Sequence, residues 1–251
     1  MTASGADPAR HPGRDPLEGI DLVVFDKDGT LIDFNSMWGG WVRNLADDLE
    51  RGTGLTLPDR LFDLLGVDRE RGVVRSHGLL AATPMARIRE HIVTLLLDQG
   101  LNVSDAEAAL RSAWHPPDPV KLARPVTNLR DLLAALRTSG RRLAVATSDD
   151  RGPTERTLAA LGIADLFDEL ACADDGEPVK PSPDAVLRLC RNLRVGPGRT
   201  AVVGDSPADL AMGRAAGAGR VIGVLTGVAE RSTLESLADL VLPSIAGLRS
   251  R

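Results

Sequence analysis

The sequence predicts an α/β fold in which a parallel sheet carries helices on both faces and an all-helical segment is inserted after the first strand. Three observations lead to this prediction. Short aliphatic runs typical of buried strands alternate with helical patterns over residues 123–251. A similar run stands alone at residues 20–25. Between these two regions, residues 40–120 show helical periodicity and no convincing strand.

The composition is typical of a globular protein and argues against several classes of function. Of its 251 residues, 43% are hydrophobic and 26% are charged, which suits one large domain or a core with an insert. Because the net charge is −5, no nucleic-acid partner is expected. No apolar run approaches a membrane span, and residues 1–18 carry no secretory signal, so no membrane partner is expected. The two cysteines, Cys172 and Cys190, favour a reduced, cytoplasmic location.

The first half of the chain contains one strand and several helices. Residues 1–18 have the character of a flexible tail, and the strand at residues 20–25 ends at Asp26-Lys27-Asp28-Gly29-Thr30. Two helices with an apolar face are expected after this strand. The first face is formed by Trp38, Trp41, Val42, Leu45 and Leu49, and the second by Met85, Ile88, Ile92 and Leu95. Ser104-Asp105-Ala106-Glu107 is typical of a capping box that starts another helix. His115-Pro116-Pro117-Asp118-Pro119 then breaks the chain and predicts a hinge.

The second half alternates helices and strands. Helices are expected from Val126 to Gly140, around Leu158 and Leu161, over residues 186–193 and from residue 206 to about Ala216. Strands are expected at residues 143–146, 167–172, 201–203, 221–225 and 240–242. Alternation of this kind is typical of a parallel sheet.

Polar side chains follow several predicted strands at the point where each strand ends. Asp26 and Asp28 follow the first strand, Thr147 and Ser148 follow another, and Asp205 follows a third. In open parallel sheets, ligands bind beyond the carboxyl ends of the strands. These residues are therefore expected at one edge of the sheet.

The chemistry of these residues points to phosphoryl transfer. Asp26, Asp28, Asp205 and Asp209 near one point would repel one another, and Mg²⁺ relieves that repulsion where phosphate oxygens share the site. Gly29 allows a close approach of the backbone, and loop amides beside it bind anions. Lys180 precedes a helix and supplies a positive charge. Only three of the 30 basic residues are lysines, namely Lys27, Lys121 and Lys180, so a retained lysine hints at a task that arginine cannot perform.

Four segments resemble the motifs of the haloacid dehalogenase superfamily. They are the run from Asp26 to Thr30, Thr147, Lys180, and Gly204-Asp205-Ser206-Pro207-Ala208-Asp209, in the right order and at suitable intervals. The resemblance covers the chain from about residue 19 to its end and is greatest to the phosphoglycolate phosphatase-like branch. It implies a Rossmann-like catalytic core of residues 19–34 and 123–251. It also implies a helical cap domain of residues 35–122.

The resemblance also implies a role for each residue. Asp26 would be the nucleophile that forms an aspartyl phosphate, and Asp28 would be the general acid and base. The Asp26 carboxylate, the Asp28 backbone carbonyl and Asp205 would hold Mg²⁺. The residues that bind the substrate phosphate would be Thr147, Ser148 and Lys180. The supporting residues would be Asp209, acting through water or on Lys180, together with Gly29 and Thr30.

Several alternatives stay open. The leading hypothesis is a phosphatase of a small phosphorylated metabolite, with 2-phosphoglycolate as the first candidate. A phosphosugar mutase is a second hypothesis, although Val is common there in place of Thr30. A non-enzymatic receiver-type phospho-acceptor module is a third, although such modules lack a second Asp two positions on. Ser206 and Asp209 also form a capping-box pattern, which needs no catalytic duty. The sequence does not reveal the oligomeric state.

Overall fold

The computed structural model describes residues 15–75, 78–83, 85–115 and 122–249. The chain divides into two compact units. One, here called the core unit, comprises the chain up to Asp33 and from Pro125 onward, and the other, the helical unit, is Phe34–Arg124. Most of the predicted tail and of the predicted hinge at residues 115–119 lies outside the described residues.

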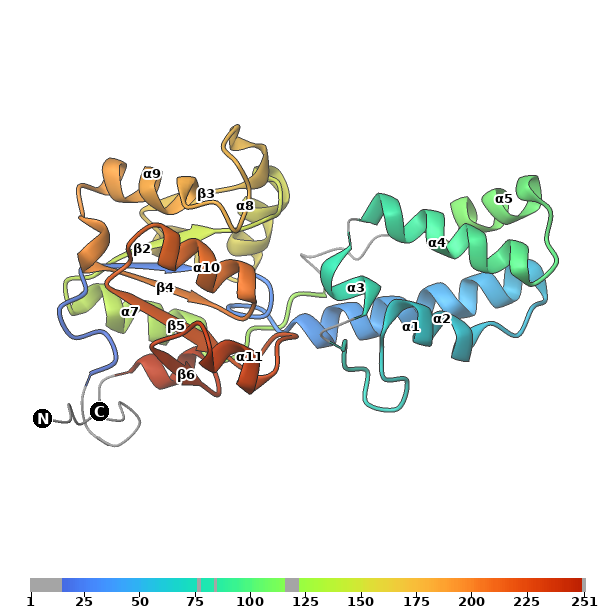
Figure 1. Ribbon diagram of the computed structural model, residues 1–251, viewed down its shortest axis with the longest axis horizontal. Helices are drawn as coiled ribbons and strands as arrows, with labels where there is room; N and C mark the ends of the chain where they lie inside the picture. Colours follow the sequence, from blue (N-terminus) through green and yellow to red (C-terminus); the bar gives the residue numbers. More distant parts are fainter. Residues whose placement is uncertain (1–14, 76–77, 84, 116–121, 250–251) are drawn as a thin grey trace, which may run out of the picture. The chain divides into compact units, whose positions relative to one another are not determined.

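The core unit contains the predicted parallel sheet. Its six strands have the order β3-β2-β1-β4-β5-β6 (Figure 1). They are β1 (Leu22–Phe25), β2 (Arg142–Ala146), β3 (Glu169–Ala171), β4 (Thr200–Gly204), β5 (Arg220–Val224) and β6 (Leu240–Leu242). All five neighbouring pairs are parallel, with Leu22 opposite both Arg142 and Thr200. The sequence-based fold class is confirmed, and β1 lies in the middle of the sheet as a fully buried strand.

Helices cover both faces of this sheet. They are α7 (Leu129–Thr138), α8 (Arg151–Ala160), α9 (Asp184–Leu193), α10 (Pro207–Ala215) and α11 (Arg231–Glu235). Short 3₁₀ turns occur at η2 (Ala164–Leu166), η3 (Ala173–Asp175), η4 (Pro197–Arg199) and η5 (Ile245–Leu248). Leu22 and Val24 point to the face covered by α9 and α10, and α7 packs on β2 from the opposite face (Figure 1). The chain passes from β1 through β2 to β3 in one direction across the sheet and then returns to β4 on the other side of β1. Because parallel crossovers are right-handed, the helices that follow β3 lie on the other face of the sheet from those that precede it.

The helical unit is built from α1 (Phe34–Thr53), α2 (Pro58–Leu65), α3 (Leu79–Ala82), α4 (Met85–Asp98) and α5 (Val103–Ala113). Its aromatic side chains form a chain of ring contacts from Phe34 through Trp38 and Trp41 to Trp114. The buried Trp41 indole also donates a hydrogen bond to the His115 carbonyl, 2.7 Å away. These contacts fit a packing role for the Trp38 and Trp41 stripe.

Two predicted helix starts are wrong by a few residues. The helix expected from Ser104 starts at Val103, because the Asn102 side chain accepts a hydrogen bond from the Asp105 amide and caps it. The helix expected from Val126 starts at Leu129 behind the cap Asn128. The Val126 amide instead donates to the Leu31 carbonyl, which ties this segment to the loop after β1.

Candidate active site

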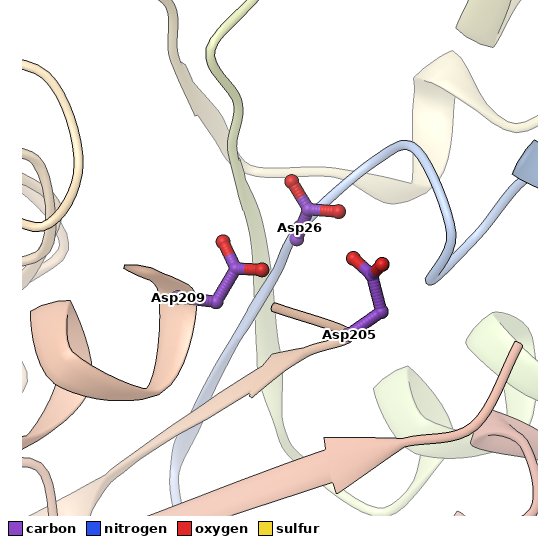
Figure 2. Close-up of side chains that lie close together, drawn as sticks. All are labelled: Asp26, Asp205 and Asp209. Carbon is purple, nitrogen blue, oxygen red and sulfur yellow. The ribbon is translucent and has the colours of Figure 1, made fainter. Parts of the chain in front are cut away.

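Three carboxylates meet at the carboxyl ends of β1 and β4. Asp26 directly follows β1, Asp205 directly follows β4, and Asp209 lies in the first turn of α10. Figure 2 shows the three side chains turned toward one another. All three are buried, and one oxygen from each lies within 4.8 Å of the others. Parallel pairing of β1 with β4 in matched register brings Asp26 and Asp205 together although 178 residues separate them.

The donor set at this point suits a divalent cation. The Asp26 Oδ2 atom is buried and has no hydrogen-bond partner among the described residues. Asp205 uses Oδ2 to accept a hydrogen bond from the Val228 amide at 3.2 Å. A Cβ atom at Gly29 or at Gly227 would clash with the Asp205 carboxylate, so both glycines keep this space clear. Buried carboxylate oxygens with unused lone pairs are the ligands that Mg²⁺ prefers.

Lys180 joins two of these carboxylates. Its ammonium lies 2.6 Å from Asp26 Oδ1 and 2.6 Å from Asp209 Oδ1, and its side chain is 7% exposed. Asp209 also accepts hydrogen bonds from the Ser206 amide and hydroxyl through Oδ2, while Ser206 accepts one from the Asp209 amide. Asp209 therefore completes the capping box and holds Lys180 at the same time, so the two interpretations of this residue are compatible.

A second lysine lies beside the first-motif aspartates. The Lys27 side chain is 1% exposed, and its ammonium lies 2.6 Å from Asp28 Oδ2 and 3.0 Å from Asp149 Oδ2. Neither Lys27 nor Asp149 is among the site residues predicted from the sequence. The scarcity of lysine was the available signal for Lys27, whereas Asp149 was marked only by following Thr147 at a strand end.

The segment from Asp26 to Ile32 is a tight loop closed on itself. The Leu31 and Ile32 amides donate to the Lys27 carbonyl, and the Gly29 amide donates to the Ile32 carbonyl at 2.7 Å. Gly29 has φ +86°, a conformation that favours glycine. Its carbonyl accepts a hydrogen bond from the Thr226 hydroxyl at 2.6 Å, a contact that the sequence did not reveal. Thr30 is fully buried inside this loop.

The two hydroxyl residues after β2 differ in exposure. Thr147 is buried, and its Oγ1 accepts a hydrogen bond from the Asp149 amide at 3.2 Å. Its hydroxyl proton is therefore left to donate to a ligand. Ser148 is exposed. Thr147 is thus held in place at the strand end, whereas the chain leaves the Ser148 side chain to solvent.

Burial and mutual repulsion shift the ionisation of the site. Burial, with Asp209 and Asp28 nearby, raises the pKa of Asp26 to about 7 against the opposing effect of Lys180. Burial also raises the pKa of Asp28 and, together with Asp26 and Asp209, raises that of Asp205 well above its usual value. Burial alone would lower the pKa of Lys180, but Asp209 and Asp26 raise it. The positive charges of Lys27 and Lys180 therefore do not fully balance the negative charge of these carboxylates, whereas a bound cation would balance it.

The metal-free protein is expected to lose stability as pH rises from about 4 to 7. Asp26 has a pKa of about 7 in the folded chain and 3.8 as its ordinary value, so the folded state binds more protons in this window. Its contribution to stability is complete below pH 4 and disappears as pH rises through 7, a loss of a few kcal/mol. A divalent cation held by the ionised carboxylates would restore that stability.

Thermal unfolding in EDTA and in Mg²⁺ at matched ionic strength measures this effect. The Tm difference between the two conditions should grow by several degrees between about pH 4 and pH 7. A Tm difference that stays constant or shrinks over this range would contradict the proposed coupling between the carboxylates and the cation.

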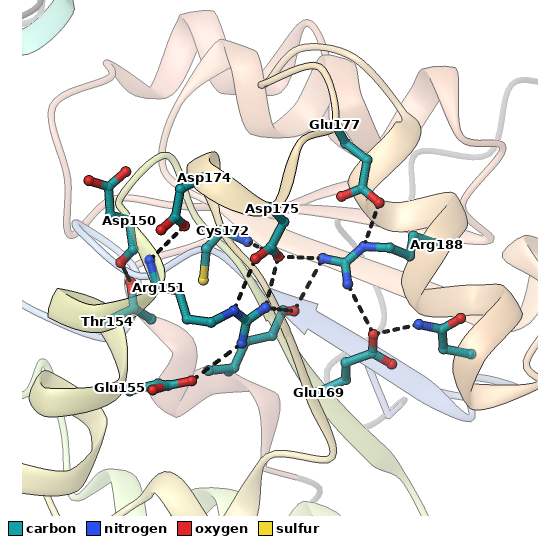
Figure 3. A network of polar contacts seen from close by, with 12 residues as sticks. Asp150, Arg151, Thr154, Glu155, Glu169, Cys172, Asp174, Asp175, Glu177 and Arg188 are labelled. Carbon is teal, nitrogen blue, oxygen red and sulfur yellow. Dashed lines mark hydrogen bonds and ion pairs between the residues drawn. The ribbon is translucent and has the colours of Figure 1, made fainter.

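An ion-pair network holds the segment that leads to Lys180 (Figure 3). Asp175 accepts hydrogen bonds from the Arg151 Nη2 at 2.8 Å, the Arg188 Nη2 at 2.6 Å and the Cys172 amide at 2.9 Å. The Arg188 Nε also lies 2.8 Å from Glu177. Because Arg151 belongs to α8 and Arg188 to α9, the network fixes residues 172–177 against two helices. Lys180 follows three residues later.

Comparison with known proteins gives consistent results. A family model described as haloacid dehalogenase-like hydrolase matches residues 20–217. The phosphoglycolate phosphatase of Rhodospirillum rubrum is 32% identical over 195 residues, covering 78% of this chain and 76% of that protein. The N-acetylmuramic acid 6-phosphate phosphatase of Pseudomonas aeruginosa is 33% identical over 200 residues, covering 79% of each.

A solved structure shares the fold. It is a HAD family hydrolase from Deinococcus radiodurans R1 with bound phosphate and sodium, at 23% identity and a TM-score of 0.66. The match covers 92% of this chain and 94% of that one. As a separate finding, none of the helices in the described part of the chain has the length and apolar character to cross a membrane.

Proposed function

The chain belongs to the haloacid dehalogenase-like hydrolases, and from that premise we propose that it is a Mg²⁺-dependent phosphatase acting through an aspartyl phosphate on Asp26. Its substrate is a small phosphorylated metabolite. The observation that carries the proposal is the state of the Asp26 carboxylate. Lys180 holds one of its oxygens, while the other is buried without a hydrogen-bond partner among the described residues, beside Asp205.

The proposed reaction has two steps. First, an oxygen of the Asp26 carboxylate attacks the phosphorus atom, the bond to the leaving oxygen breaks, and Asp28 gives that oxygen a proton. Asp28 then takes a proton from a water that attacks the aspartyl phosphate, which releases inorganic phosphate and regenerates Asp26. To transfer both protons, the Asp28 carboxylate must lie close to the leaving oxygen and to the attacking water. Asp28 is two residues from Asp26 on the same tight loop.

Other residues of this chain hold the transferring group. Lys180 and Thr147 lie buried at the same sheet edge and can neutralise or donate to phosphoryl oxygens, with Ser148 beside them. Asp209 fixes Lys180, and Gly29 and Thr30 shape the loop. The Asp26 and Asp205 carboxylates and the Asp28 backbone carbonyl would hold Mg²⁺, which offsets negative charge on the phosphoryl group.

The identity of the metabolite is the finer part of the proposal. One relative at 32% identity is named for phosphoglycolate and another at 33% for a sugar phosphate, so similarity does not separate these substrates. We take 2-phosphoglycolate as the first candidate and assign residues 35–122 as the cap domain.

We also place the enzyme in the cytoplasm, because Cys172 and Cys190 are both free and buried.

Release of inorganic phosphate tests the function directly. The purified chain is incubated with p-nitrophenyl phosphate, 2-phosphoglycolate and a set of sugar phosphates, in Mg²⁺ and in excess EDTA. We expect many turnovers in Mg²⁺, none in EDTA, and poor replacement by Ca²⁺, which prefers longer bonds and more ligands. Stoichiometric labelling without turnover would indicate a phospho-acceptor module instead. Isomerised sugar phosphate with little free phosphate would indicate a mutase, and full activity in EDTA would exclude the metal.

A further inference from the structure

Lys27 is a buried charge that the two-step reaction above does not use. Its ammonium contacts Asp28 and Asp149, and its side chain is 1% exposed, against 46% for Asp149. A charge removed from water is costly unless it is paired, so these two carboxylates are what allow Lys27 to be buried. In the triad of Lys27, Asp28 and Asp149, the buried ammonium therefore links one of the two first-motif carboxylates to the half-exposed carboxylate of Asp149.

The two oxygens of Asp28 have different surroundings. Oδ2 accepts a hydrogen bond from the Lys27 ammonium at 2.6 Å, whereas Oδ1 is buried and has no hydrogen-bond partner within the described residues. Asp26 shows the same division, with Lys180 on Oδ1 and no partner on Oδ2. A buried acceptor without a partner is costly, which is why such atoms are found where a ligand completes them.

We propose that Lys27, anchored by Asp149, is a positioning residue that fixes the Asp28 carboxylate with Oδ1 free for the leaving oxygen and then for water. The role rests on the proposed function, because it requires Asp28 to be the general acid and base. An ammonium suits this position, since it is a compact charge that can contact two carboxylates from a narrow buried space.

The backbone of the loop does not depend on the Lys27 side chain. The Lys27 carbonyl accepts hydrogen bonds from the Leu31 amide at 2.9 Å and the Ile32 amide at 3.1 Å. The loop is closed further by the Gly29 amide on the Ile32 carbonyl. Replacing the side chain therefore leaves the loop closed and removes the only ammonium that the described residues place on Asp28.

A double-mutant cycle between Lys27 and Asp28 separates positioning from mere structure. The variants are Lys27→Met, Asp28→Asn and the pair, and rapid acid quench after p-nitrophenyl phosphate measures the hydrolysis rate of the aspartyl phosphate. We expect Lys27→Met alone to slow hydrolysis by roughly 10–100-fold, and by less than about threefold when Asp28 is already Asn. Formation of the phosphoenzyme from this good leaving group should change little, whereas formation from an alkyl phosphate should fall.

Controls account for stability. Arg141→Met removes a partly buried ion pair, to Asp15 at 2.6 Å, just before the start of β2 and thus at the sheet edge opposite the site. It should lower Tm without changing hydrolysis per folded molecule. If Lys27→Met fails to fold, Asp149→Asn replaces it, because that side chain is half-exposed and its loss leaves Lys27 on Asp28. It should give a smaller slowing that also disappears in Asp28→Asn.

The outcomes distinguish this inference from the function on which it rests. Equal slowing by Lys27→Met in both Asp28 backgrounds, or equal loss of both reaction steps, would overturn the positioning role and leave the phosphatase intact. If the unaltered chain forms no aspartyl phosphate, the proposed function fails first, and the positioning role fails with it.

Discussion

Asp26→Asn is expected to abolish turnover, with a loss on the order of 10⁴-fold or more, because the amide cannot act as the nucleophile. The substitution keeps the shape of the side chain, and Lys180 keeps its second partner, Asp209. The fold should therefore survive. No acid-stable label should remain on the protein after incubation with a substrate that carries labelled phosphate.

Asp21→Asn is the matched control for Asp26→Asn. Asp21 stands immediately before β1, at the opposite end of the strand from Asp26, and it pairs with Arg199 on the surface. Its loss should leave turnover unchanged. A labelled phosphoenzyme in the Asp26→Asn variant would assign the nucleophile to another residue, and the buried carboxylate cluster would then serve only to bind the cation.

Asp28→Asn is expected to trap the intermediate that Asp26→Asn prevents. The nucleophile remains, and p-nitrophenolate leaves without needing a proton, so the aspartyl phosphate still forms. Its hydrolysis lacks a general base and should slow by roughly 10²–10⁴-fold. The phosphoenzyme should therefore accumulate to nearly one equivalent, together with a burst of p-nitrophenol before a slow steady state.

The leaving group supplies an internal check on the Asp28→Asn result. An alkyl phosphate needs protonation of its leaving oxygen, so the variant should form phosphoenzyme from it far more slowly than from p-nitrophenyl phosphate. Rapid quench with both substrates measures the two rates. Normal turnover by Asp28→Asn would show that another group moves these protons, and the Lys27 contact would then have only a structural role.

The fold class and the candidate residues of the site could be predicted from the sequence alone. Strand and helix patterns are local properties of the chain, and alternation of the two leads to a parallel sheet with right-handed connections. Once that sheet is accepted, Asp26 and Asp205 must share an edge, because each directly follows a parallel strand. The strand ends and the charge pattern also indicated Asp28, Thr147 and Lys180, and the motif resemblance implied a role for each without any knowledge of their contacts.

Which charged side chains contact one another could not be predicted from the sequence and is seen in the folded structure. It placed Lys180 between Asp26 and Asp209 and showed that Asp209 caps α10 as well. It also paired Lys27 with Asp28 and Asp149. Such pairings depend on how the loops after different strands pack together and on which rotamer each side chain adopts there. Local sequence periodicity does not reveal loop packing or rotamers. Lys180 and Asp26, for example, lie 154 residues apart and come into contact only after the sheet has formed.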